Sequence, residues 1–222
     1  MKAVLLALVA FVSVGASPVD WTKMVSRMPN GAYVLGNPKA KVRLVEYLSY
    51  SCNHCAEFSA QSAAPLKANY VAKGNVAVEI RNAVRDRYDF AAALLARCGG
   101  ATKFFAQSEA LFSGQDALLQ RASSHEARST MAANASTNDV LADMASGAGL
   151  IDFMASRGVP SAAANACLTN KAEQDAVLAM AKEAWEVRKL QGTPSFLING
   201  RNTGPAHWRD LEPKLRAAIA AK

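Results

Sequence analysis

The sequence has few cysteines and histidines, the usual ligands of zinc and copper, and no long basic segment. Its 222 residues include only four cysteines and three histidines, and no run of Lys and Arg is longer than a pair. The absence of a basic run argues against a nucleic-acid-binding stripe, although the formal net charge is +7. No internal repeat and no low-complexity segment is present. With 51% hydrophobic and 19% charged residues, the composition is that of an ordinary globular protein.

Long apolar runs are also missing. The longest one lies at the N-terminus, where Lys2 is followed by an apolar stretch from Ala3 to Val12 and by small residues up to Ala16. This stretch is too short to span a bilayer comfortably, which takes about 20 residues. The pattern predicts a secretory signal over residues 1–16, with an uncleaved anchor or a buried first helix as the alternatives. We therefore expect export to a compartment where disulfides persist.

The rest of the chain alternates between strand-like and helical patterns, which predicts an α/β fold. Residues 17–30 read as a polar lead-in. β-branched and aromatic residues predict strands over 31–36, 41–50, 76–84 and 194–200, the last with a turn at Asn199-Gly200. Helices are expected over 55–72, 171–190 and 207–220. Between about 86 and 170 the sequence becomes alanine-rich with frequent breakers, which predicts an insertion of four to six short helices.

The motif Cys52-Asn53-His54-Cys55 follows a predicted strand and begins a predicted helix. The first cysteine would then lie at the positive end of the helix dipole, which favours its thiolate. His54, as an imidazolium, would stabilise that thiolate further. A stabilised thiolate makes the corresponding disulfide an oxidising one. A zinc or copper site and an inert structural disulfide are the alternatives, but Cys98 and Cys167 are isolated and offer no second ligand pair.

A second motif, "GTPSFLING" over residues 192–200, places Pro194 at the entrance to a strand. A proline cannot donate a hydrogen bond inside a ladder, so this position suits the start of a strand. A cis bond before Pro194 would turn the backbone of Thr193 outward, ready to pair with an extended substrate. An ordinary trans proline is the alternative.

The two motifs, in this order and separated by an alanine-rich helical block, resemble the DsbA family of thioredoxin-fold thiol-disulfide oxidoreductases. The resemblance implies a thioredoxin fold over 17–85 and 171–222, interrupted by a helical domain over 86–170. It also implies that Cys52 is the nucleophile, Cys55 the resolving thiol and His54 the tuning residue. The Thr193–Pro194 bond would be cis and close to Cys52. Glu46 matches the family's buried acid, and it could exchange a proton with Cys55; a solvent-facing, salt-bridged strand residue is the alternative.

The resemblance also predicts the biochemical setting. It implies a periplasmic oxidase that acts on reduced cysteine-containing exported proteins and is reoxidised by a quinone-linked membrane partner similar to DsbB. We expect a monomer that binds no nucleic acid, cofactor or metal. Asn53 and Thr193 depart from the commonest family pattern, so a reductase or isomerase that works from the dithiol state stays open. A metal-binding or chaperone-like module without turnover is the rival from another class.

Cys98 and Cys167 lie in the predicted helical insertion, each on its own helix. We expect them to form a second, structural disulfide that joins two of these helices, as in some DsbA-like relatives. The alternative is a pair of separate buried thiols that pack as small apolar groups.

Overall fold

A six-stranded mixed sheet organises the molecule. The computed structural model describes residues 19–132 and 134–221, so the predicted signal over 1–16 lies outside the described residues. The strand order is β1-β2-β4-β3-β5-β6. Strands β3 and β4 are parallel, and all other neighbours are antiparallel. The strands span Val25–Arg27 (β1), Tyr33–Leu35 (β2), Val42–Leu48 (β3), Val76–Asn82 (β4), Ser195–Ile198 (β5) and Arg201–Pro205 (β6).

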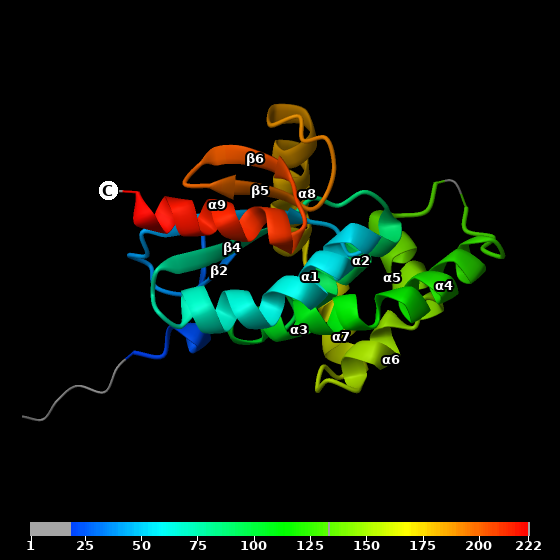
Figure 1. Ribbon diagram of the computed structural model, residues 1–222. Helices are drawn as coiled ribbons and strands as arrows, with labels where there is room; N and C mark the ends of the chain where they lie inside the picture. The colour runs from blue at the N-terminus through cyan, green and yellow to red at the C-terminus, as the bar shows by residue number, and fades with distance from the viewer. Residues whose placement is uncertain (1–18, 133, 222) are drawn as a thin grey trace, which may run out of the picture.

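Helices cover the sheet and form a separate block beside it (Figure 1). Six helices between β4 and α8 gather on one side of the sheet, within the range predicted for the insertion. These six are α2 (Arg87–Ala96), α3 (Ala101–Ser113), α4 (Gln115–Glu126), α5 (Thr137–Gly147), α6 (Leu150–Ala155) and α7 (Ser161–Leu168). The sheet itself is accompanied by α1 (Asn53–Leu66), α8 (Lys171–Lys182) and α9 (Trp208–Ala220). Helices α1 and α8 each continue into a π-helical segment, over Lys67–Val71 and Glu183–Val187.

The two faces of the sheet pack against two different clusters of buried residues. Because side chains alternate along a strand, Leu44 and Leu48 of β3 join the large core, which also includes Phe58 of α1. Val45 and Tyr47 point to the opposite face and join a smaller cluster with Leu190 and its neighbours. The residues of β3 are therefore covered on both sides, which explains why five of its seven residues are apolar.

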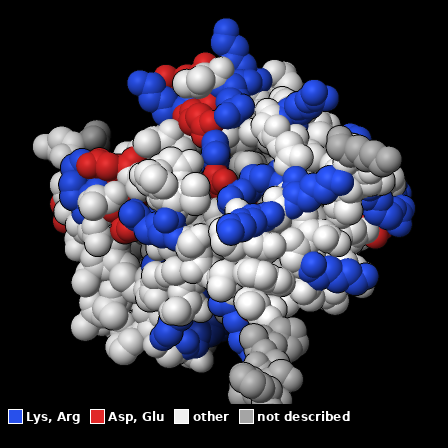
Figure 2. Space-filling view, turned by 90° about the vertical axis from the view of Figure 1, so that its left-hand side faces the viewer, with Lys and Arg blue, Asp and Glu red and all other residues white. Residues whose placement is uncertain are grey.

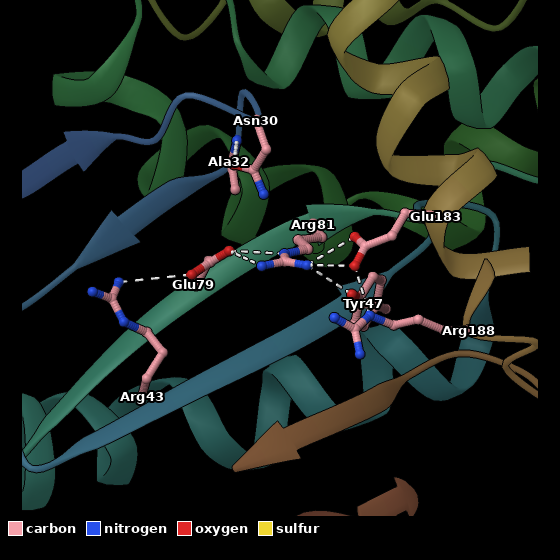
Figure 3. A network of polar contacts seen from close by, with 8 residues as sticks. All are labelled: Asn30, Ala32, Arg43, Tyr47, Glu79, Arg81, Glu183 and Arg188. Carbon is pink, nitrogen blue, oxygen red and sulfur yellow. Dashed lines mark hydrogen bonds and ion pairs between the residues drawn. The ribbon is translucent and has the colours of Figure 1, made fainter. Parts of the chain in front are cut away.

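A network of charged side chains occupies the second face (Figure 3). Arg81 of β4 lies at its centre, with Nε 2.8 Å from Oε1 of Glu79 and Nη1 2.8 Å from both oxygens of Glu183. Nη1 of Arg81 also donates to the hydroxyl of Tyr47 at 2.9 Å, and Arg188 contacts Glu183 at 2.6 Å. The network thereby joins two neighbouring strands to the segment that follows α8.

Local signals fixed some element boundaries and failed at others. Helix α8 begins at Lys171, where the sequence predicted a helix to start, and Asn170 caps it by accepting the backbone N–H of Glu173. The polar lead-in over 17–30 was an incomplete description, because it contains a 3-10 turn and the edge strand β1. A three-residue strand is too short to show an alternating pattern. Pro213 lies in the second turn of α9, and Pro65 lies inside α1 near its end.

Basic side chains are prominent at the end of the sheet that lies away from α2–α7. Figure 2 shows this end, where Lys and Arg side chains outnumber Asp and Glu. Two of the chain segments that contribute to the sheet, 21–45 and 187–209, contain no acidic residue. Over the described residues, none of the helices combines the length and the apolar character that crossing a bilayer requires.

Candidate active site

The two cysteines of the first motif lie at the junction between β3 and α1. Cys52 is the N-cap residue of α1, and its carbonyl oxygen accepts the backbone N–H groups of Cys55 and Ala56 at 3.0 and 3.2 Å. Both thiols are free. Cys52 is 5% exposed, while Cys55, one turn further into the helix, is fully buried. Only the first thiol can therefore meet a macromolecular partner without a rearrangement.

The loop before β5 lies directly against Cys52. The peptide bond between Thr193 and Pro194 is cis. Strand β5 pairs with β3 through Ser195 and Tyr47, so the loop is held at the end of β3 from which Cys52 follows. The Sγ atom of Cys52 lies 3.1 Å from the carbonyl oxygen of Thr193. The structure thus brings together the two sequence motifs, although 141 residues separate their contacting members.

The surroundings of Cys52 and Cys55 shift the pKa values of the two thiols in opposite directions. The pKa of Cys52 is lowered to about 5, chiefly because the Cys55 thiol donates a hydrogen bond to the Cys52 thiolate. The carbonyl of Thr193 favours the protonated thiol, whereas the hydroxyl of the same residue favours the thiolate. Burial raises the pKa of Cys55 well above that of an ordinary thiol. At neutral pH, Cys52 is therefore a nucleophilic thiolate, while Cys55 remains a protonated thiol.

Arg85 is a further positive group at the site, and sequence reasoning missed it. Its Nε atom donates to Oγ of Ser49 at 3.0 Å, and Nη2 donates to Oγ of Ser51 at 3.1 Å. Because Ser51 directly precedes Cys52, these bonds hold the guanidinium beside the thiolate, and its charge contributes to the lowered pKa of Cys52. The carboxylate of Asp86 accepts from Oγ of Ser51 at 2.5 Å and offsets part of this positive charge. Arg85 follows β4 in a loop, where no spacing signal identifies it.

His54 is placed differently from the tuning residue that was predicted. Its side chain is 73% exposed, and Nδ1 lies 3.9 Å from the carboxylate of Glu57. The ring of His207 faces it edge-on, with 6.3 Å between the ring centroids. Cys55, Thr193 and Arg85 supply contacts that stabilise the thiolate. The predicted tuning role of His54 stays a prediction.

The helical block holds the turn that carries Cys52. Asp89 of α2 accepts the backbone N–H of Tyr50 at 2.7 Å and that of Arg85 at 3.0 Å. Burial raises the pKa of Asp89 to about 7. Gln115 of α4 donates to the carbonyl oxygens of Tyr50 and Cys52, at 2.8 and 3.1 Å. The backbone around the reactive thiol is thus positioned by side chains from outside the sheet and α1.

Glu46 lies on β3 and is 6% exposed, so it is not a solvent-facing strand residue. It lines a small cavity of about 70 Å³ between the sheet, α1 and α3, whose walls are mostly apolar. Burial raises the pKa of its carboxyl to about 8, and its charge acts on Cys55. A carboxyl that is still protonated at neutral pH can give a proton to a nearby thiolate. This position is compatible with the predicted proton exchange, which stays a prediction.

The remaining two cysteines form a disulfide within the helical block. Cys98, just after α2, is bonded to Cys167 of α7 with an S–S distance of 2.04 Å. The bond closes a loop with a sequence separation of 69 residues. On the chain-entropy account, a loop of this length contributes about 4 kcal/mol of stability.

Over residues 19–132 and 134–221, no group of three or more His, Cys, Asp or Glu side chains is placed to hold a metal ion.

Comparisons with known proteins agree with this geometry. A family model described as thioredoxin matches residues 29–217. The chain is similar to a solved protein-disulfide isomerase from Novosphingobium aromaticivorans, with 35% identity and a TM-score of 0.78 over 86% of this chain and 98% of the other. Wolbachia pipientis alpha-DsbA1 is 22% identical, with a TM-score of 0.68 over 86% of this chain and 92% of the other, and shows the same fold.

A comparison with curated protein sequences gives further relatives. A protein of Rickettsia felis that is named as a protein-disulfide oxidoreductase is 29% identical over 182 residues, which is 82% of this chain. The chain spans 58% of the length of that relative. The family model covers most of the chain, and the solved relative is matched over nearly its whole length. The chain therefore belongs to the thioredoxin family, and its α/β fold with a helical block between β4 and α8 is that of the DsbA-like members.

Proposed function

We propose that the chain is an exported thiol-disulfide oxidoreductase that introduces disulfides into reduced client proteins through Cys52 and Cys55. The observation that supports this proposal most strongly is the difference in pKa between the two thiols. The pKa of Cys52 is lowered to about 5 at the rim of the site, and burial raises that of Cys55 behind it. Stabilising the Cys52 thiolate stabilises the dithiol form, so the Cys52–Cys55 disulfide is driven to accept electrons.

The exchange proceeds in two steps from the oxidised protein. A client thiolate attacks Sγ of Cys52, a mixed disulfide forms, and Cys55 leaves as a thiolate that takes up a proton. A second client thiolate then attacks the client sulfur of the mixed disulfide, which releases Cys52 as its stabilised thiolate. Two electrons pass from the client to the protein, and the client gains one disulfide. Glu46 supplies and recovers the proton at Cys55, because its buried carboxyl has a pKa of about 8.

The cis peptide loop supports client binding in this proposal. Thr193 lies between Cys52 and the start of β5, with its carbonyl oxygen 3.1 Å from the reactive sulfur. A client in an extended conformation would pair with the backbone of Thr193 and so present its own sulfur to Cys52. We further propose a periplasmic location and reoxidation by a quinone-linked membrane partner similar to DsbB.

An isomerase or reductase is the second candidate, because the Novosphingobium aromaticivorans relative is named a protein-disulfide isomerase. The two candidates differ in the redox potential of the Cys52–Cys55 pair. A titration against glutathione measures it, and thermal melting of both redox forms provides a cross-check. An oxidase requires the reduced form to be the more stable one. A more stable oxidised form, or a potential near that of thioredoxin, would exclude the oxidase.

A module that binds clients without turnover is tested separately. Cys52→Ser removes the nucleophile and should abolish the oxidative refolding of a reduced client such as ribonuclease A. Cys98→Ala combined with Cys167→Ala removes the other sulfur pair and serves as the matched control, which should retain oxidation. Oxidation that persists in the Cys52→Ser variant would exclude the proposed function.

A further inference from the structure

A pocket of about 270 Å³ opens beside the reactive thiol, and its lining differs from an ordinary apolar groove. It is formed by the first turn of α1, the loop before β5 and the segment that leads into α9. The lining residues are His54, Thr193, Pro194, Ala206, His207 and Asp210. Thr193 is also the residue that contacts Cys52, so the pocket lies next to the path that a client must follow.

The fixed charges around this pocket are mainly negative, although the whole chain carries +7. Among the residues that the structure describes, no Lys or Arg lines the pocket, whereas Asp210 does. The carboxylate of Glu57 borders it, 3.6 Å from Nδ1 of His207 and 3.9 Å from Nδ1 of His54. Uncharged imidazoles add no positive charge and offer nitrogen lone pairs to a donor. Arg209 approaches Asp210 at 3.8 Å, but its side chain is 82% exposed and does not line the pocket.

The polar groups of this pocket are mainly acceptors. The carboxylates of Asp210 and Glu57 accept hydrogen bonds, and the neutral imidazole rings of His54 and His207 offer a nitrogen lone pair each. These groups suit a cationic donor, because such a group donates several hydrogen bonds and carries the opposite charge.

We propose that this pocket binds a Lys or Arg side chain of the client, next to the client cysteine that reacts with Cys52. The inference rests on the proposed function and names the class of client segment that the site prefers. Neighbouring residues of an extended chain are about 3.3–3.6 Å apart along the strand. A residue adjacent to the client cysteine therefore lies within reach of a pocket that shares Thr193 with the thiol.

The preference is measured with three peptides that are identical except for the residue beside their single cysteine pair, which is Lys, Gln or Glu. The rate constant kcat/KM for peptide oxidation is determined at pH 8 and low salt. The Lys peptide should react about tenfold faster than the Glu peptide, with the Gln peptide between them, as expected for a partly exposed site. Added salt should reduce this ratio, because it screens exposed charges.

Two variants test whether the named carboxylates produce the preference. Asp210→Asn and Glu57→Gln should each reduce the Lys-to-Glu ratio from about tenfold to about threefold. Asp175→Asn removes an exposed carboxylate from α8 and should leave the ratio unchanged. Thermal melting of each variant shows that it is folded, and the ratio compares two substrates of the same sample.

The outcomes separate the subsite from the proposed function. Equal rates for all three peptides, a preference for Glu, or a ratio that both variants leave intact would overturn the subsite, while the Gln peptide is still oxidised. Failure to oxidise any of the peptides would remove the proposed function and the subsite together.

Discussion

Replacing Arg85 by Gln should make Cys52 a weaker acid. The substitution removes the positive charge that Ser49 and Ser51 hold beside the thiolate. Two unit charges interact with about 1 kcal/mol in water at a separation of ~4 Å, and with less when they are further apart. The guanidinium is exposed and Asp86 offsets part of its charge, so the interaction lost should be below this limit, at about 0.7 kcal/mol. The pKa of Cys52 should therefore rise by about 0.5, since one pKa unit corresponds to about 1.4 kcal/mol.

The assay is the thiolate absorbance near 240 nm, followed against pH in the reduced protein. The same change corresponds to about a threefold shift in the exchange equilibrium with glutathione, or about 15 mV toward a less oxidising potential. Asp86→Asn should move the pKa of Cys52 in the opposite direction, and Asn can still cap α2 where Asp86 now accepts the N–H of Asp89. Lys103→Gln, on α3, is the control for loss of one positive charge. An unchanged pKa in both the Arg85 and the Asp86 variants would refute the electrostatic reasoning.

Three further predictions concern pH and buried charges. First, the lowered pKa of Cys52 stabilises the reduced fold above the pKa of the unfolded thiol, and this effect is lost as pH falls through about 5. Between pH 4 and 9, melting should therefore show the reduced form gaining about 2–3 kcal/mol over the oxidised form, which is roughly half of what the full pKa shift would give. Second, Arg81→Ala should destabilise the protein by about 3 kcal/mol in denaturant unfolding, because it leaves the buried Glu79 without its nearest cation. Third, Glu46→Gln should slow oxidation of a reduced client at pH 7 by about tenfold or more, since the amide cannot supply a proton to Cys55.

Each of these has an outcome that would count against it. Equal pH profiles of stability for the two redox forms would contradict the first, and the Cys52→Ser variant is its control. An Arg81→Ala variant as stable as Lys23→Ala, which removes an exposed cation, would contradict the second. Unchanged rates in Glu46→Gln, with Glu109→Gln as the neighbouring control at the same cavity, would contradict the third.

The central strands and the helical insertion could be predicted from sequence because local chemistry determines them. Five of the seven residues of Val42–Leu48 are apolar, and Asn170 with Glu173 marks the start of α8. The strand order could not be predicted, since pairing between β3 and β4 or between β3 and β5 joins segments that are far apart in the chain. β1 was missed because three residues at a sheet edge carry no periodic signal.

The candidate site, like the fold, could be predicted from the sequence only in part. The spacing of Cys52 and Cys55 and the position of Pro194 are visible in the sequence, and the resemblance to DsbA gave them roles. Arg85 and Gln115 are not visible, because each is an ordinary polar residue in a loop or at a helix start until the fold brings it to the cysteine turn. Tertiary contacts alone distinguish them from the many other Arg and Gln residues of the chain.

The bond between Cys98 and Cys167 makes every new copy of this chain a consumer of the reaction that it is proposed to carry out. A newly synthesised polypeptide starts with both of these thiols reduced and has to lose two electrons before the disulfide joins the end of α2 to α7. Under the proposed function, mature molecules accept those electrons, so the existing pool would help to complete new copies. On this view the protein would build up slowly in a compartment that contains none, and faster once the first copies are complete.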